Sequence, residues 1–265
     1  MHDQSDTWLR LGRLEGEYSE IYSPGSLMKW PERLRSMLGW IKEVGPSVIC
    51  LQEVDYQLFE SDLLPALQSL GYSGLSQRPK KMCKNQPCGC ATFWRHDRFK
   101  LNKQCIKSRA MAVHLRDRTH QSQEVVVVNV HLEASQSAAS ARNRARQINS
   151  PLRWAAEQAT GVPVLVAGDF NTGGDSPLLH VLRNECWHGH DLAAAYEHPA
   201  ASDTLPVCNA SMACHDVRLL IDHIFYSHSQ FELDSILEVC QSLTAPLAIH
   251  RHQPTSNAST RAAIR

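Results

Sequence analysis

The chain has 265 residues, of which 43% are hydrophobic, so it is long enough to bury a substantial core. Lysine plus arginine number 27 and aspartate plus glutamate also number 27, which gives a formal net charge of zero. This balance excludes a globally basic surface of the kind that advertises nucleic-acid binding, although local basic patches remain compatible with it. No apolar run approaches the roughly 20 residues that a membrane-spanning helix needs, so we expect no membrane span.

Residues 1–6 lack the basic and apolar regions of a secretory signal. Nine cysteines form an odd number, which without such a signal favours reduced thiols. We therefore expect a cytoplasmic protein, with the nucleus as the alternative. Cys83, Cys88 and Cys90 crowd one predicted loop, but their spacing is unusual for a zinc site and favours free thiols.

Four segments carry helical patterns. They are residues 30–45, residues 63–70, residues 136–160 and the segment that begins at Ser176-Pro177. The first and last of these have a proline in the first turn, where its missing N–H is tolerated. Pro151 is expected to kink the third helix or to restart it. Residues 76–90 and 198–216 are expected to form loops, and the polar tail from Thr255 onward is expected to carry no final apolar strand.

Short apolar runs rich in branched side chains predict buried strands. They cover residues 47–51, 91–94, 125–130, 162–167 and, around two polar residues, 219–221 and 224–226. Strands interspersed with helices predict a mixed sheet or a pair of sheets covered by helices. No linker divides the chain, so we expect one domain over residues 1–265, with a core at about 28–240 and a polar tail at 255–265.

Polar residues with catalytic potential stand at the ends of these strands. Asp169 and Asn171 lie two residues apart, so an extended chain would point both to the same face. A carboxylate can work with a metal or orient water, and an amide can donate hydrogen bonds to an oxyanion. Glu53, His131 and Asp222 end or adjoin other runs. Each alone is more simply a strand exit or a core histidine, but together they predict a site that handles phosphate.

The order of these motifs resembles the endonuclease/exonuclease/phosphatase superfamily. Within it, the chain is most similar to carbon-catabolite-repressor-type poly(A) nucleases, the deadenylase, nocturnin and Angel group. The similar segments are Trp30-Pro31-Glu32-Arg33, Leu51-Gln52-Glu53-Val54-Asp55, Gly89-Cys90-Ala91-Thr92-Phe93-Trp94, His131-Leu132, Gly168-Asp169-Phe170-Asn171 and Asp222-His223-Ile224-Phe225-Tyr226.

The resemblance implies an α/β (α+β) fold, a four-layer αββα sandwich of two mixed sheets with outer helices. It also implies a phosphodiesterase that uses Mg²⁺, or Mn²⁺, and cleaves RNA from its 3′ end. By the same resemblance, Glu53 would bind the metal and His131 would contact the scissile phosphate. Asp169 would orient the attacking water, Asn171 would hydrogen-bond the phosphate, and Asp222 would orient a catalytic histidine elsewhere.

Two pieces of the family pattern are missing. Residues 7–12 lack the asparagine of the family's first strand, and Asn257-Ala258 stands where the family has the aspartate and histidine of a Ser-Asp-His motif. The sandwich is therefore expected to lack its first and last strands. His223, His250 and His252 are the candidate replacements, but a displacement of about 1 Å already impairs catalysis, which disfavours replacement.

Three functions stay open on these grounds. The first is the Mg²⁺-dependent 3′-exoribonuclease, and the second is a phosphoesterase acting on a nucleotide, a lipid headgroup or a protein–DNA adduct. The third is a degenerate domain or incomplete product that binds RNA or a protein partner without turnover. Basic residues within 78–84 fit either an RNA backbone or a solvated loop. Arg142, Arg144 and Arg146 are expected to face solvent.

Overall fold

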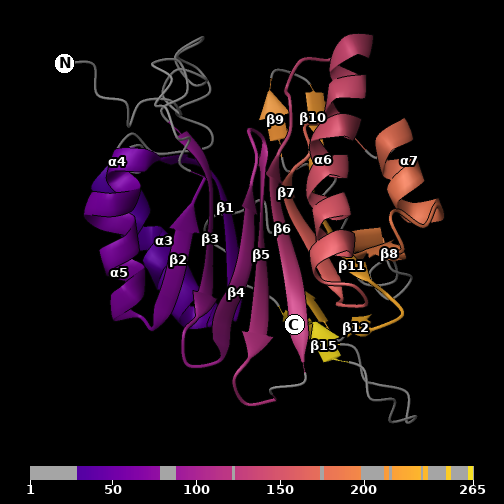
Figure 1. The fold of residues 1–265 in the computed structure, drawn as a ribbon. Helices are drawn as coiled ribbons and strands as arrows, with labels where there is room; N and C mark the ends of the chain where they lie inside the picture. The colour runs from indigo at the N-terminus through magenta and orange to yellow at the C-terminus, as the bar shows by residue number, and fades with distance from the viewer. Residues whose placement is uncertain are drawn as a thin grey trace.

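The computed structural model describes residues 29–77, 88–120, 123–173, 176–197, 212–214, 217–233, 235–237, 249–251 and 262–264. Within them, two sheets pack face to face and helices cover both outer faces (Figure 1). The smaller sheet has the order β1-β3-β2 and is antiparallel throughout. Its strands are β1 (Val48–Asp55), β2 (Tyr72–Ser76) and β3 (Cys88–Arg95).

The larger sheet is mixed and has the order β4-β5-β6-β7-β11-β8. Its strands are β4 (Phe99–Ile106), β5 (Ala110–Asp117), β6 (Glu124–His131), β7 (Val164–Asp169), β8 (Leu192–Ala194) and β11 (Asp222–Ser227). Strands β6 and β7 are parallel, so their C-terminal ends lie at the same edge. Strand β11 is antiparallel to β7, so it is the start of β11 that reaches this edge.

Helices form the two outer layers. The smaller sheet is covered by α3 (Trp30–Val44), α4 (Tyr56–Leu58), the π-helix η3 (Phe59–Leu63) and α5 (Leu64–Ser69). The larger sheet is covered by α6 (Ala138–Gln158) and α7 (Pro177–Asn184) (Figure 1). This arrangement confirms the predicted αββα sandwich. None of the described helices is long and apolar enough to cross a membrane.

Short elements complete the described chain. They are the 3₁₀ helix η4 (Ala195–Glu197) and the strand pairs β9 (Met212–Cys214) with β10 (Val217–Leu219), β12 (Phe231–Leu233) with β15 (Ala262–Ile264), and β13 (Ser235–Leu237) with β14 (Ile249–Arg251). Strand β15 corrects the expectation of a tail without a strand, since its apolar residues pair in parallel with β12. The altered motif at Asn257-Ala258 and residues 7–12 lie outside the described residues. The single domain stays a prediction.

Strand β6 shows why the sequence builds two layers of core. Val126, Val128 and Val130 lie in the cluster that packs under α6 and α7. Val125 and Val127 alternate with them and lie in the cluster between the two sheets. A central strand that is buried on both faces accounts for the continuous apolar run in the sequence.

Asn129 interrupts that run and ties the two sheets together. Its side chain is fully buried and its amide nitrogen donates to Leu51 O at 3.1 Å and Ala91 O at 2.9 Å. Its amide oxygen accepts a hydrogen bond of 2.8 Å from Gln52 Nε2. A buried amide with its partners satisfied fixes geometry, because any shift of one sheet would leave polar groups unpaired.

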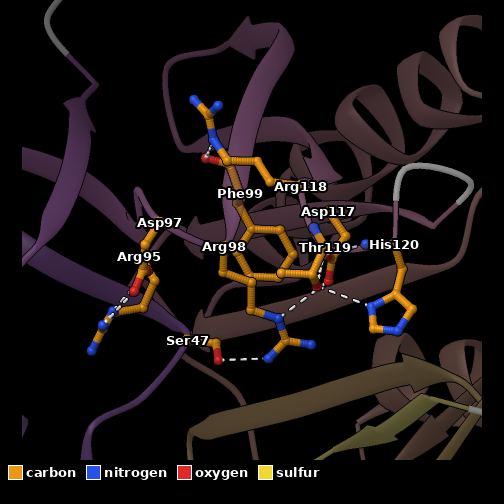
Figure 2. A network of polar contacts seen from close by, with 9 residues as sticks. All are labelled: Ser47, Arg95, Asp97, Arg98, Phe99, Asp117, Arg118, Thr119 and His120. Atoms are coloured by element: carbon orange, nitrogen blue, oxygen red, sulfur yellow. Dashed lines mark hydrogen bonds and ion pairs between the residues drawn. The ribbon is translucent and has the colours of Figure 1, made fainter.

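A second polar network lies at the end of the sandwich where β1 begins and β5 ends (Figure 2). Arg98 donates from Nη1 to Ser47 Oγ at 2.8 Å and from Nε to Asp117 Oδ2 at 3.3 Å, so it joins the start of β1 to the end of β5. Burial opposes ionisation of Asp117, but hydrogen bonds from Thr119, His120 and Arg98 outweigh it and hold its pKa at about 2. The ionised carboxylate therefore fastens this end of the fold.

Some local expectations need correction. Of the two outcomes expected at Pro151, a kink or a restart, the structure excludes the restart, because α6 runs through this buried proline. Cys88 and Cys90 belong to β3 rather than to a loop, and Cys90 is fully buried in the cluster between the two sheets. Strands β4 and β5 had no counterpart in the sequence analysis, since polar residues interrupt the apolar pattern of β4.

The inter-sheet role of Asn129 predicts a large stability loss on truncation. Asn129→Ala should lower the free energy of unfolding by about 2–4 kcal/mol, because Gln52 and two backbone carbonyls lose buried partners. Urea denaturation of the full chain measures this. Asn102→Ala is the matched control, since Asn102 is exposed on β4, and should change stability by about 0.5 kcal/mol or less. Equal losses in both variants would contradict the account.

Candidate functional site

The ends of β6 and β7 bring His131 and Asp169 side by side. The two residues are partners in the parallel register, and His131 Nε2 lies 3.7 Å from Asp169 Oδ2. Both side chains are mostly buried, with 16% and 22% of their surface exposed. Along β7, Leu165 packs against the inter-sheet cluster, and Asp169 follows it with the same alternation. The pair therefore lies at the edge where the two sheets meet.

Glu53 reaches this pair from the smaller sheet. Its Oε1 lies 3.8 Å from His131 Nε2. Strand β1 bulges between Leu51 and Val54, and Glu53 has a φ of +54° in the left-handed region. A non-glycine residue held in this region is strained, and such strain persists only where the surroundings impose it. The neighbouring Gln52 supplies that constraint through its bond to Asn129.

Asn171 is held beside Asp169 by a tight turn. Its backbone N–H donates to Asp169 Oδ1 at 2.7 Å, and its Nδ2 donates to Leu132 O at 2.9 Å. Asn171 has a φ of +50°, so this turn is also left-handed. Gly168, at φ +137°, precedes it, and a Cβ at that position would collide with Val130 O. The glycine thus lets β7 approach β6 closely just before the site.

Asp222 also lies beside these site residues, but at the start of a strand, whereas the sequence suggested that it stands at the end of one. It begins β11 rather than following a strand, and it is the register partner of Asp169. The sequence could not show that β11 runs antiparallel to β7, which places its first residue at the site. Asp222 is exposed, whereas the other four predicted site residues, Glu53, His131, Asp169 and Asn171, are half-buried or buried. The structure brings all five to one edge.

His223 does not enter the site. Successive side chains of a strand alternate between faces, so His223 points away from the face that Asp222 shares. Its Nε2 donates to Thr172 O at 3.1 Å, and its ring packs edge-on against Phe170 with centroids 5.4 Å apart. His223 is therefore a buried histidine that fastens the loop after Asn171.

Charge and burial shape the protonation of the central pair. Burial raises the pKa of Asp169 to about 6, with a further upward contribution from Asp222, while the Asn171 N–H works against the shift. Burial lowers the pKa of His131; Glu53 opposes this, and the nearby Arg109 adds to it. The site thus favours a neutral imidazole and a carboxyl group that titrates not far below neutrality.

A buried arginine supports the loop that follows His131. Arg144 Nη1 donates to Glu133 O at 2.9 Å and to Ser135 O at 2.6 Å. Gln136, on the same loop, donates to Asn171 O at 3.2 Å. Arg144 is only 4% exposed, which corrects the expectation that it faces solvent. Its guanidinium satisfies loop carbonyls, a contact that helical periodicity alone does not reveal.

The donor set fits a magnesium ion better than a metal that needs a dense cluster of ligands. Within the described ranges, no group of three or more His, Cys, Asp or Glu side chains is arranged to hold a metal. Glu53 Oε2, however, is buried and has no hydrogen-bond partner among the described residues. Mg²⁺ keeps several waters and is commonly held by one or two carboxylates plus substrate phosphate. Glu53 meets that requirement.

The shifted pKa of Asp169 predicts an unusual pH dependence of stability. The folded state keeps a proton up to about pH 6 that the unfolded chain loses near pH 4, so stability falls as pH rises through this window. Asp169→Asn removes the titration. It should be more stable than the wild type above pH 6 by about 1–2 kcal/mol, after discounting for solvent screening, and nearly equal to it below pH 4.

Urea denaturation across this pH range in EDTA measures the difference. Asp191→Asn is the control, since Asp191 is exposed and pairs with His228 on the surface. A stability difference between Asp169→Asn and wild type that does not change with pH would contradict the burial of this carboxylate.

Comparison with known proteins agrees with this geometry. A sequence model of the endonuclease/exonuclease/phosphatase family matches residues 14–243. Nocturnin of Drosophila melanogaster is 25% identical over 271 residues, covering 87% of this chain and 41% of the relative. Nocturnin of Homo sapiens is 27% identical over 254 residues, covering 85% of this chain and 55% of the relative. The chain thus spans about half the length of these curated relatives.

Solved structures share the fold. The crystal structure of ANGEL2, a 2′,3′-cyclic phosphatase, aligns with a TM-score of 0.66 at 19% identity, covering 81% of this chain and 79% of that one. The human Nocturnin catalytic domain with a bound sulfate anion aligns with a TM-score of 0.62 at 23% identity, covering 87% of this chain and 83% of that one. From the family match over most of its length, the chain belongs to the endonuclease/exonuclease/phosphatase family.

Proposed function

We propose that this protein is a Mg²⁺-dependent phosphodiesterase that shortens RNA from its 3′ end. The observation that carries the proposal is the convergence of Glu53 and Asp169 on the imidazole of His131, at 3.8 and 3.7 Å, from two different sheets. A packed fold does not require two carboxylates at one mostly buried histidine. In a site for a metal-bound phosphate such a cluster has a purpose, because the ion and the substrate supply the charge partners that the protein alone lacks.

In the proposed reaction each residue has a distinct role. Glu53 holds Mg²⁺, which when bound offsets the negative charge that develops on the phosphate. Asp169 orients the attacking water, and its pKa of about 6 leaves it ionised yet able to take up a proton near neutral pH. His131 and Asn171 donate hydrogen bonds to the phosphate oxygens. Asn171 Nδ2 has a second hydrogen for this purpose beyond the one given to Leu132 O.

Asp222 has an effect beside the role that the family resemblance implies, and orienting a catalytic histidine elsewhere stays a prediction for it. Its place opposite Asp169 raises the pKa of that residue and makes it a better proton acceptor. A role in orienting a catalytic histidine would need a partner other than His223, which lies on the opposite face. The relatives support phosphoester chemistry in general, and RNA as the substrate is our proposal. The cytosol or nucleus likewise stays a prediction.

A second candidate function is a degenerate domain that binds RNA or a protein without turnover. Asn257-Ala258, in place of the family's aspartate and histidine, favours it. Removing a central acid or base costs about 100- to 10,000-fold in rate, which separates the two candidates clearly.

The decisive experiment incubates the full chain with Mg²⁺ and RNA labelled at its 5′ end and carrying a poly(A) 3′ end. Stepwise shortening is expected, and EDTA should abolish it. Asp169→Ala should slow shortening by roughly 100- to 10,000-fold. The matched control is Asp191→Ala, which removes an exposed carboxylate outside the site and should leave the rate unchanged.

The remaining outcomes distinguish the alternatives. Shortening by the wild type no faster than by Asp169→Ala would overturn the RNA proposal. Release of phosphate from a nucleotide, an inositol lipid headgroup or a tyrosyl-DNA adduct instead would identify the other phosphoesterase function. RNA binding without turnover, with turnover restored by Asn257→Asp plus Ala258→His, would establish the degenerate domain.

A further inference from the structure

The turn between β4 and β5 lies at the same edge as the candidate site. Gln77 Nε2 donates to Lys107 O, and His131 N donates to Arg109 O at 3.0 Å. The turn is therefore attached to residues that follow β2 in the smaller sheet and to the end of β6 in the larger one. Arg109, which the sequence analysis did not single out, is fixed beside His131 by its own backbone.

The register of β5 with β6 tells which way Arg109 points. Ala110 pairs with Val130, and the next antiparallel pair outward is Arg109 with His131. Directly opposed residues in such a pair share a face of the sheet. Met111, Val113 and Leu115, at the same alternation as Arg109, all lie in the inter-sheet cluster. The Arg109 side chain thus continues an inward-facing row and emerges at the site.

The electrostatic effects of Arg109 agree with this direction. Burial and then Glu53 and Asp55 raise the pKa of Cys88, and Arg109 opposes them. Burial lowers the pKa of His131, and Arg109 adds to that shift. Cys88 lies on β3 of the smaller sheet, and His131 lies on the larger one. An effect of one cation on groups of both sheets agrees with the inward direction that the register gives Arg109.

The guanidinium of Arg109 forms no ion pair within the described part of the chain, although it lies near enough to Glu133 to help lower the pKa of that carboxylate. It makes no ion pair within 4.0 Å and donates no side-chain hydrogen bond there, although Arg109 is half-buried. Two arginines near the other end of the larger sheet form ion pairs: Arg98, in the turn before β4, with Asp117, and Arg116 with Glu124. A role as a structural counter-charge would place a carboxylate against it. An open guanidinium fork beside a proposed phosphate contact fits an incoming oxyanion instead.

We infer that Arg109 binds the substrate phosphate and donates hydrogen bonds to its non-bridging oxygens. Arg109 and Asp169 lie on opposite sides of His131, because β5 and β7 flank β6. The inference rests on the proposed function for the location of the phosphate. It adds a residue that holds the substrate rather than one that moves a proton. The planar fork of arginine can engage two phosphate oxygens at once, which a lysine at this position would not reproduce.

Binding of adenosine 5′-monophosphate to the full chain in Mg²⁺, measured by isothermal titration calorimetry, tests the inference without turnover. Arg109→Gln should raise the dissociation constant for this nucleotide by about 10- to 100-fold, the loss expected for a charge-assisted hydrogen bond. The dissociation constant for adenosine, which lacks phosphate, should not change. The midpoint of thermal unfolding should also stay the same, which a purely structural role would not predict.

Arg116→Gln is the matched control. It removes the same charge, but Arg116 lies on β5, on the other face and about 23 Å from Arg109 along the strand direction, and pairs with Glu124. An unchanged affinity of Arg109→Gln, or an equal loss in Arg116→Gln, would overturn the inference. So would a wild type that does not bind the nucleotide.

The two proposals can fail separately. RNA shortening by the wild type together with unchanged nucleotide binding in Arg109→Gln would refute only the role of Arg109. The opposite outcome is also informative. If the wild type binds the nucleotide but leaves RNA intact, and Arg109→Gln loses nucleotide binding, the phosphate site is supported and the RNA function is refuted.

Discussion

The fully buried amide of Asn129 sets the distance between the two sheets, and the site depends on that distance. Its donors reach backbone carbonyls of β1 and β3, and its oxygen receives Gln52, the residue just before Glu53. Two residues farther along β6 stands His131. The same side-chain contact that joins the sheets therefore also aligns a carboxylate of one sheet with an imidazole of the other. Hydrophobic packing alone is non-directional and would tolerate sliding between the sheets.

Backbone strain gathers where this alignment is needed. Of the three described non-glycine residues with positive φ, Glu53 and Asn171 lie here and His188 lies elsewhere, and Gly168 is in a region that only glycine adopts easily. These conformations cost about 1–3 kcal/mol each for non-glycine residues and persist because surrounding contacts impose them. The constraints come from Asn129 on one side and from the loop held by Arg144 on the other. These strained conformations lower the stability of the fold at this edge, and they hold its polar groups in fixed positions before any substrate binds.

The sequence predicted the ends of β6 and β7 well, because continuous branched runs followed by His131 and Asp169 leave little choice of structure. It also predicted α7 from its Ser176 cap, whose hydroxyl accepts the Leu179 N–H as expected. Features set by pairing between distant strands escaped it. The direction of β11 decides that Asp222 begins a strand, and the register of β5 decides that Arg109 faces inward. Neither follows from local pattern, since both depend on which strand lies next to which.

The central claim is that the edge where the sheets meet holds a divalent cation against Glu53. Crystals of the full chain grown with Mn²⁺, which scatters anomalously where Mg²⁺ does not, test it directly. The account predicts an anomalous peak about 2 Å from a Glu53 carboxylate oxygen, absent in crystals of Glu53→Gln. Saturating Mn²⁺ with no peak at Glu53, or a peak that survives in Glu53→Gln, would contradict the claim.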